Sequence, residues 1–280
     1  MSKDESNERC MDTNARLSRL LEIMARLRDP ETGCPWDIEQ TYASIVPYTI
    51  EEAYEVADAV DQNDMTELEG ELGDLLLQVV YYTQMGSEDG YFTFDSVIDN
   101  ISNKMVHRHP HVFGDGNRDK TASQQTLDWE KIKAGERATK NDTKMRTLDG
   151  IAKNLPALTR AVKLQKRAAR VGFDWPEAIQ VLEKIKEECA ELVEANETLP
   201  YAKQVEEFGD LMFALANLGR QLKIDPEEAL RSANRKFQQR FEYIEDALEA
   251  AGKTPTQSEL IEMDKLWDEA KVMEDSEYKK

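Results

Sequence analysis

The stretch Glu187-Glu188-Cys189-Ala190-Glu191, followed sixteen residues later by Glu207-Phe208-Gly209-Asp210, decides the fold of this 280-residue chain. Residues three and four apart share one face of a helix, so each stretch places its acidic side chains on one surface. Apolar residues are interleaved at helical spacing, so these carboxylates border the face that should be buried. Carboxylates this close raise one another's pKa and destabilise the fold unless a cation neutralises them. We therefore expect two antiparallel helices to present four carboxylates to a hard divalent cation, with Mg²⁺ or Mn²⁺ the best fit.

The same pattern occurs earlier, as Glu51-Glu52-Ala53-Tyr54-Glu55 followed by Glu71-Leu72-Gly73-Asp74, and each acidic position lies 136 residues before its counterpart. A Lys/Arg pair with a four-residue step and then a tryptophan follow each group: Lys104, Arg108 and Trp129 in the first copy, and Lys236, Arg240 and Trp267 in the second. A single match of this kind is often only a solvated helix face. Two matches with the same spacing indicate a tandem duplication of a metal-binding helical unit.

The composition favours a helical protein of two domains, each large enough to bury a core. Charged residues make up 33% of the chain, whereas Gly and Pro are sparse, with 13 and 9. The formal net charge of −20 opposes binding to nucleic acid or to anionic lipid. A phosphate-bearing substrate would therefore need metal ions and a local basic cluster.

Cysteine usage and the N-terminal segment predict a cytoplasmic location. The three cysteines are scattered and form no CxxC motif, so neither a disulfide framework nor a zinc site is expected. The N-terminal segment lacks the apolar run of a signal peptide, and no stretch approaches the length of a membrane span. We expect no membrane association.

The apolar periodicity predicts an all-α fold, with nothing that reads as a robust strand. We expect residues 1–14 to be disordered, an N-terminal domain over 15–138, a polar, basic linker over 139–153 and a C-terminal domain over 154–273. In the helix expected over 67–85, the buried face should consist of Leu68, Leu72, Leu75, Leu76 and Val79. His107, His109 and His111 suggest a metal site, but Pro110 breaks the helix there and no further soft ligand is near. A loop or helix terminus near the phosphate region is therefore the favoured interpretation.

A multi-carboxylate cation site beside a Lys/Arg pair suits phosphate chemistry. A Gly-rich phosphate loop is absent from the sequence, which excludes a P-loop enzyme. Neither acidic group contains a Glu-x-x-His pair, which argues against a di-iron redox bundle. With the histidines confined to one segment, a Ser/His/Asp set is implausible. By elimination, the residues indicate a metal-dependent phosphoanhydride or phosphoester hydrolase.

The paired EExxE and ExxD motifs, together with CPWD, YTIEEAYEV, ELGDLLLQVV, HRHPHVFGD and NRKFQQRF, resemble the MazG family of nucleoside triphosphate pyrophosphohydrolases. The resemblance covers roughly residues 17–270. EExxE and ExxD alone also mark related all-α pyrophosphatases that act on dUTP or modified dCTP, whereas HRHPHVFGD is much more specific. The resemblance implies a helical homodimer that uses Mg²⁺ to hydrolyse nucleoside triphosphates, ATP among them, to the monophosphate and pyrophosphate. Such an activity would clean the nucleotide pool or control nucleotide or alarmone levels.

In two-domain members of that family the C-terminal copy is the main catalytic one, which implies roles for matching positions here. The residues that would bind magnesium are Glu188, Glu191, Glu207 and Asp210. Lys236 and Arg240 would hold the phosphates, and Trp267 would sit against the nucleoside. Lys133 would reach in from the end of the N-terminal domain. Water, activated by the metal and a nearby carboxylate, would attack the α-phosphorus.

The N-terminal copy also retains a full set of acidic positions, namely Glu52, Glu55, Glu71 and Asp74. It should bind metal, and by the resemblance it serves mainly in dimer assembly or regulation, or is weakly active. The alternative function for the whole chain is a non-catalytic nucleotide-binding regulator linked to the stress response. Its mark would be loss of a ligand carboxylate from both copies, and neither copy has lost one.

Overall fold

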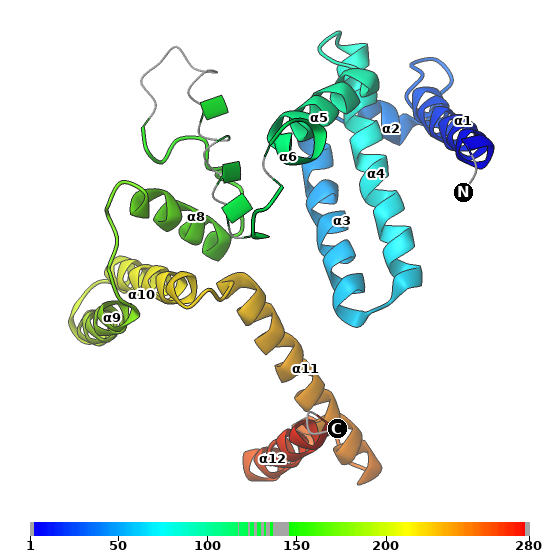
Figure 1. The fold of residues 1–280 in the computed structure, drawn as a ribbon. Coiled ribbons are helices and arrows are strands. Elements are labelled where there is room, and N and C mark those ends of the chain that lie inside the picture. Colours follow the sequence, from blue (N-terminus) through cyan, green and yellow to red (C-terminus); the bar gives the residue numbers. More distant parts are fainter. Residues whose placement is uncertain are drawn as a thin grey trace. The chain divides into compact units, whose positions relative to one another are not determined.

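The computed structural model describes residues 3–277, except 117, 123, 126–127, 130–131, 133–134 and 137–145, and side chains within 13–274. The chain divides into two compact units, Met1–Arg137 and Ala138–Lys280. Over the described residues both units consist of helices and turns, with no strand (Figure 1). The predicted all-α fold is confirmed. The predicted linker 139–153 begins outside the described residues, which resume at Arg146, and the helix expected over 127–138 lies partly outside them.

The first unit contains six described helices: α1 (Lys3–Leu27), α2 (Pro35–Glu39), α3 (Tyr42–Gln62), α4 (Met65–Glu88), α5 (Phe94–Arg108) and α6 (Pro110–Phe113). The expectation of disorder through residue 14 is wrong, because α1 begins at Lys3. Residues 3–13 contain no Gly or Pro and include Lys, Glu and Arg, which are good helix formers. The expectation of disorder rested on the polarity of these residues and not on their helix propensity.

Local capping fixes the helical hairpin of α3 and α4. Thr41 begins α3 with a capping box, in which its Oγ1 accepts from the Ser44 N–H at 3.2 Å and its N–H donates to Ser44 Oγ at 2.9 Å. Asp64 caps α4 by accepting from the N–H groups of Thr66 and Glu67, both at 3.0 Å. Asn63 turns the chain between them in the left-handed conformation, with φ 56°. The two helices therefore run antiparallel, side by side (Figure 1).

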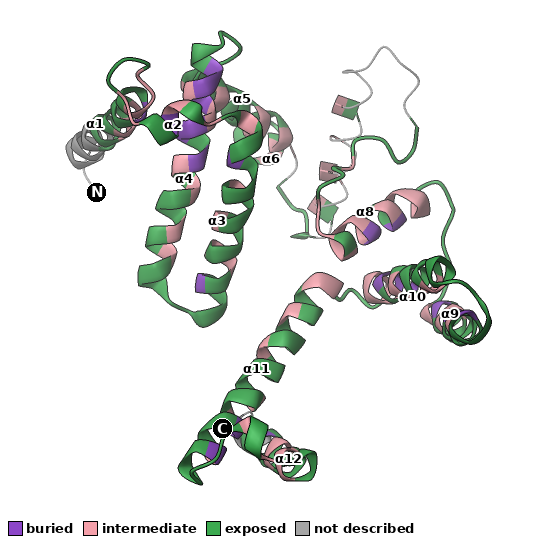
Figure 2. Cartoon of the chain, turned by 180° about the vertical axis from the view of Figure 1, so that it is seen from behind, coloured by how far each residue is buried: buried purple, intermediate pink, exposed green. Residues whose placement is uncertain are grey.

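The core of the first unit lies at one end of this hairpin, where α1 and α5 also meet α4 (Figure 2). Its buried residues are Met24, Ile45, Val80, Tyr81 and Met85. The other half of the hairpin, which carries the acidic motifs, is mostly exposed. Of the predicted buried face, Leu72, Leu76 and Val79 are 51%, 41% and 39% exposed, so the prediction is wrong for these three in the single chain. Leu68 and Leu75 are half-buried.

The second unit contains α8 (Ala157–Ala169), α9 (Ala178–Thr198), α10 (Tyr201–Gln221), α11 (Pro226–Ala250), a 3₁₀ turn η1 (Pro255–Gln257) and α12 (Leu260–Glu277). Helices α9 and α10 form a second antiparallel hairpin, α8 packs on α10, and α11 continues to α12 (Figure 1). The sequence Asp225-Pro226-Glu227-Glu228 predicts an N-cap followed by a proline at the first helical position and acidic residues in the first turn. The structure confirms it, because Asp225 caps α11 by accepting from the N–H groups of Glu227 and Glu228. None of the described helices combines the length and apolar character needed to cross a membrane.

Candidate metal and phosphate site

The hairpin of α9 and α10 brings three predicted ligands together in the second unit. Glu188 of α9 and Glu207 and Asp210 of α10 each offer a carboxylate oxygen, and these oxygens all lie within 4.8 Å of one another. Glu188 is buried, Glu207 is half-buried and Asp210 is exposed, so the cluster opens from the helix interface towards solvent. We call these three residues the C-terminal cluster.

Glu188 shows how well this cluster suits a cation. Its side chain is only 7% exposed, and Lys184 Nζ lies 2.8 Å from its Oε1. Its Oε2 is buried and has no hydrogen-bond partner. An unpaired buried carboxylate oxygen is costly, and a directly bound cation removes that cost. Three carboxylate oxygens from two helices form the donor set that hard divalent cations prefer.

Lys184 is a site residue that the sequence analysis missed. Its ammonium group bridges Glu188 and Glu187, with Nζ 2.7 Å from Glu187 Oε1, and hydrogen bonds to Glu187 and Glu188 raise its pKa. The available signal was its position four residues before Glu188, on the same helix face. Its counterpart in the first copy is Tyr48, so the two copies differ in charge at this position.

Glu191, the fourth predicted ligand, lies outside the C-terminal cluster. Burial raises the pKa of its carboxyl group, Lys184 opposes that rise, and the charge of Glu188 adds to it. The charge of the cluster therefore affects the pKa of Glu191, which lies one turn further along α9.

The N-terminal copy also gathers three carboxylates, but a different three. Glu52, Glu55 and Glu71 lie within 4.8 Å of one another, and Asp74 stays outside this N-terminal cluster. Burial raises the pKa of Glu52, and the charge of Asp74 raises it further. Buried Gln78 donates from Nε2 to Glu52 Oε1 at 3.4 Å, while its Oε1 has no partner. An amide thus occupies the edge of this cluster, where the second copy has Ala214.

The predicted phosphate-binding cations lie on α11. Arg240 forms a bidentate pair with Glu274 of α12, with Nε–Oε1 at 3.0 Å and Nη2–Oε2 at 2.7 Å. Its guanidinium also lies over the ring of Trp267, the predicted nucleoside contact, 5.2 Å from the ring centroid. Phe237 packs against the same ring, with ring centroids 5.2 Å apart. Lys236 is exposed one turn earlier. Arg240 and Trp267 therefore contact other residues of α11 and α12, and they are not part of the C-terminal cluster.

The first unit repeats this pairing. Arg108 of α5 forms the same bidentate contact with Glu136, with Nε–Oε1 at 3.0 Å, and Trp129 packs against His109 with ring centroids 5.6 Å apart. His109 Nδ1 lies 2.7 Å from the Met105 carbonyl oxygen, so this histidine closes the end of α5, in keeping with the favoured interpretation. Lys133 lies outside the described residues.

Comparison with known proteins agrees with this duplicated arrangement. The family model described as "MazG nucleotide pyrophosphohydrolase domain" matches residues 40–113, and the one described as "Phosphoribosyl-ATP pyrophosphohydrolase" matches residues 155–237. The "Nucleoside triphosphate pyrophosphohydrolase" of Escherichia coli (strain K12) is 48% identical over 92% of this chain and 98% of its own length. The chain belongs to the MazG family of nucleoside triphosphate pyrophosphohydrolases.

Further relatives support the assignment to the MazG family. The "Nucleoside triphosphate pyrophosphohydrolase/pyrophosphatase MazG" of Thermotoga maritima is 42% identical over 90% of this chain and 94% of its own length. "Uncharacterized protein YabN" of Bacillus subtilis is 46% identical over 90% of this chain, which spans 51% of that relative. The resemblance identified from the sequence motifs is confirmed, and the chain is an enzyme of this class.

Proposed function

We propose that this MazG-family enzyme hydrolyses nucleoside triphosphates, ATP among them, to the monophosphate and pyrophosphate at the C-terminal cluster. The observation that carries this assignment is the buried, unpartnered Oε2 of Glu188 beside Glu207 and Asp210. Water would add to the α-phosphorus while the bond from that phosphorus to the bridging oxygen breaks, so pyrophosphate leaves. Cleaning of the nucleotide pool, or control of nucleotide or alarmone levels, is the cellular role that we propose.

Magnesium is the cation that we propose for the cluster, with Mn²⁺ as a possible substitute. Glu188, Glu207 and Asp210 would hold it, with Glu191 as the fourth ligand. When bound, Mg²⁺ would neutralise phosphate charge and lower the pKa of water. Lys184 would neutralise Glu188 and Glu187 when no metal ion is bound.

Lys236 and Arg240 are proposed to hold the phosphates, Trp267 to lie against the nucleoside, and Lys133 to reach in from the end of the first domain. Arg240 already pairs with Glu274, so a phosphate would have to share its guanidinium or displace that carboxylate. The N-terminal cluster is proposed to bind metal with less or no turnover, since Gln78 donates to Glu52 there.

A homodimer is proposed as the working form of the enzyme. Val205 and Phe208, which flank Glu207 on α10, are 53% and 56% exposed in the single chain. Near Glu71 on α4, Leu72 and Leu76 are 51% and 41% exposed. Apolar surface of this kind on both acidic hairpins is typical of a face that a second copy covers. The cytoplasmic location expected from the sequence stays a prediction.

The test uses matched variants of the two clusters, Glu207→Gln and Glu71→Gln, in a Mg²⁺-dependent assay that resolves pyrophosphate from orthophosphate. Each change keeps the side-chain shape and removes one charge. We expect Glu207→Gln to lose at least about a hundredfold in turnover, since even weaker disturbance of a metal site costs 10–100-fold. Glu71→Gln should retain most activity.

Equal loss from both variants would contradict the division of labour between the copies. Nucleotide binding without pyrophosphate release from the wild-type protein would favour the alternative, a non-catalytic regulator. Orthophosphate as the first product would contradict attack at the α-phosphorus.

A further inference from the structure

The carboxylate that pairs with Arg240 has no role in the assignments above, although the same contact recurs in both units. Glu274 of α12 and Glu136 of the first unit each hold the arginine of a Lys/Arg pair through two hydrogen bonds. We propose that Glu274 is a positioning residue, which fixes the guanidinium of Arg240 for contact with the phosphates and stays paired when substrate binds. This inference rests on the proposed function and decides between sharing and displacement at Arg240.

The sequence repeats the elements of this contact. In each copy a glutamate follows the tryptophan by seven residues, as Trp129 and Glu136 in the first copy and Trp267 and Glu274 in the second. Seven residues are about two helical turns, so Trp267 and Glu274 lie on one face of α12. The arginine and the glutamate are 28 residues apart in the first copy and 34 in the second. The same pairing thus forms across connections of different length, which favours a role for the contact itself.

The contact fixes both an edge and a face of the Arg240 guanidinium. Arg240 Nε lies 3.0 Å from Glu274 Oε1, and Nη2 lies 2.7 Å from Oε2. The guanidinium carbon lies 5.2 Å from the ring centroid of Trp267, and Phe237 packs against that ring. The side chain of Arg240 is only 16% exposed. Arg240 is therefore held in one orientation, so less conformational freedom is lost when a phosphate binds.

Sharing of Arg240 between Glu274 and a phosphate fits the chemistry of both groups. A guanidinium carries five N–H donors in a rigid fork, so a carboxylate can orient it while it contacts a second anion. The hydrogen bond from Arg240 lowers the pKa of Glu274, burial opposes this, and the charges of Arg240 and Lys236 lower it further. Displacement by a phosphate would separate a charged, partly buried carboxylate from its arginine, and sharing avoids that cost.

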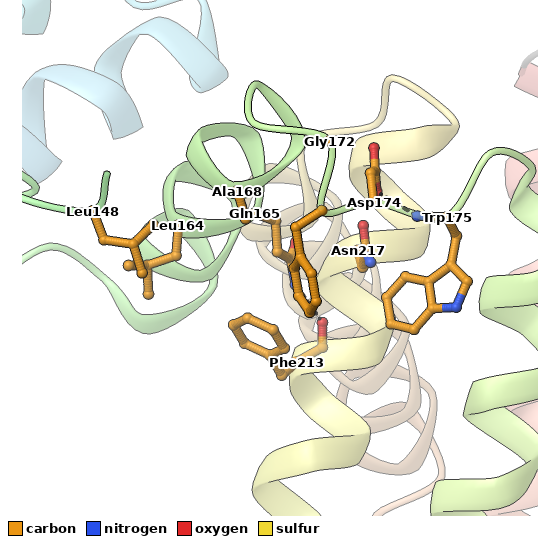
Figure 3. A pocket seen from close by; sticks show the side chains of 10 residues that line it. Leu148, Leu164, Gln165, Ala168, Gly172, Asp174, Trp175, Phe213 and Asn217 are labelled. Carbon is orange, nitrogen blue, oxygen red and sulfur yellow. Dashed lines mark hydrogen bonds between the residues drawn. The ribbon is translucent and has the colours of Figure 1, made fainter. Parts of the chain in front are cut away.

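The large pocket of the second unit does not account for this contact (Figure 3). The pocket has a volume of about 550 Å³ and is formed by the C-terminal half of α8, the 172–175 turn and the second half of α10. Arg240, Trp267 and Glu274 are not among its lining residues. The contact between α11 and α12 is therefore not part of the wall of this pocket.

The experiment compares Glu274→Ala and Glu274→Gln with Arg240→Lys and with the double variant Glu274→Ala/Arg240→Lys. Glu262→Ala is the matched control, because Glu262 of α12 forms a separate ion pair with Lys253, which follows α11, at 2.8 Å. Each protein is assayed for kcat and KM with ATP in Mg²⁺. Calorimetry measures the Kd of α,β-methylene ATP, and the melting temperature shows whether each variant is folded.

We expect Glu274→Ala to raise KM for ATP and Kd for the analogue about tenfold with kcat little changed. The reason is that a loosely held arginine loses phosphate binding common to the ground and transition states. Glu274→Gln keeps one acceptor for Arg240 and should raise both constants less. In the Arg240→Lys background, Glu274→Ala should change them less than about twofold, since Glu274 acts through Arg240. Glu262→Ala should behave as wild type.

The proposal is overturned if Glu274→Ala keeps the wild-type KM, or if it lowers KM, because a lower KM means that Glu274 competes with the phosphate. Additive effects of Glu274→Ala and Arg240→Lys overturn it as well. An equal rise of KM in Glu262→Ala would reduce the contact to a tie between α11 and α12. Should Glu274→Ala not fold, Glu274→Gln alone and combined with Arg240→Lys gives the same comparison.

Failure of the proposed function gives a different result, namely no pyrophosphate from the wild-type enzyme. Calorimetry with α,β-methylene ATP needs no turnover, so it would still show in that case whether Glu274 acts through Arg240.

Discussion

Gly209 separates Phe208 from Asp210 in the acidic motif of α10, and a Cβ at this position would meet no atom within 4 Å. Glycine in a helix interior costs about 0.5–1 kcal/mol relative to alanine. We expect Gly209→Ala to raise the free energy of unfolding by up to about that amount. Chemical denaturation in the presence of EDTA measures it.

Gly86→Ala provides the contrasting control. A Cβ there would lie 2.5 Å from the Phe92 ring, so this variant should be destabilised. A lower stability of Gly209→Ala would contradict the open environment described for Gly209. It would instead mean that another surface approaches the helix closely at this point.

At the scale of single residues, the sequence predicted the acidic side chains well and their partners poorly. Spacing of three and four residues along one helix identifies Glu207 and Asp210. Lys184 had the same kind of local signal and was overlooked. The Glu274 partner of Arg240 lies 34 residues away on another helix, so only tertiary packing pairs them. Glu191 and Asp74 lie outside their clusters. This also depends on how the two helices of each hairpin pack, which the spacing of residues along one helix does not show.

The acidic helices themselves carry a measurable pH dependence. Burial raises the pKa of Glu52, Glu71 and Glu191, and the charges of neighbouring carboxylates add to it. A carboxyl group with a raised folded pKa binds more protons in the folded state, so stability falls as pH rises above its ordinary value of 4.5. We expect the melting temperature in EDTA to be higher at about pH 5.5 than at about pH 7.5.

Magnesium should restore the melting temperature at the higher pH, because a bound cation replaces the missing protons. A monovalent salt at equal ionic strength is the control for general repulsion in a chain of net charge −20. Burial raises the pKa of Glu88, but hydrogen bonds from Arg28 and Gln84 and the charge of Arg28 together outweigh it, so this pKa is lowered. The hydrogen bond from Arg240 is the main cause that lowers the pKa of Glu274. The stability that these two groups contribute is therefore lost only as pH falls below 4.5. A melting temperature that rises steadily from pH 5.5 to 7.5 in EDTA would contradict the prediction.

At the scale of elements, period and capping predicted most helices, because both are local properties. The capping of α11 by Asp225 is confirmed for this reason. The start of α1 was wrong because polarity was taken as disorder. The face of α4 was wrong for a different reason. Leu72 and Val79 have the apolar character of buried residues, but nothing among the described elements of the single chain covers them.

For the whole molecule, the uncovered hairpins predict a dimer. We expect light scattering after size exclusion to give about twice the chain mass of 32.1 kDa. Leu72→Asp should shift the population towards monomer, because a charge would be buried in the apolar contact. Val171→Asp, at a residue 67% exposed in the turn after α8, is the control.

A wild-type mass of 32.1 kDa at assay concentrations would contradict the dimer. A dimer unaffected by Leu72→Asp would move the interface away from the α3–α4 hairpin.

The 136-residue repeat predicted two copies of one unit, and the structure has two compact units. The differences between the copies could not be weighed from the repeat alone. Gln78 and Ala214 occupy equivalent positions, but only the pairing of α3 with α4 shows that Gln78 reaches Glu52. The pocket beside α10 was also missed, since its walls come from segments as far apart as Leu148 and Asn217.

The lysine four residues before Glu188 gives the C-terminal copy a counter-ion of its own. Lys184 offsets the charge of Glu187 and Glu188 on α9, which lowers the repulsion that α9 presents to the acidic residues of α10 before any metal binds. Tyr48 brings no such charge to α3, so the first hairpin needs a proton or a captured ion for the same step. We therefore expect the two units to fold and bind metal in different orders. In the second unit the helical hairpin should form before the metal ion binds, whereas in the first unit the two events should occur together.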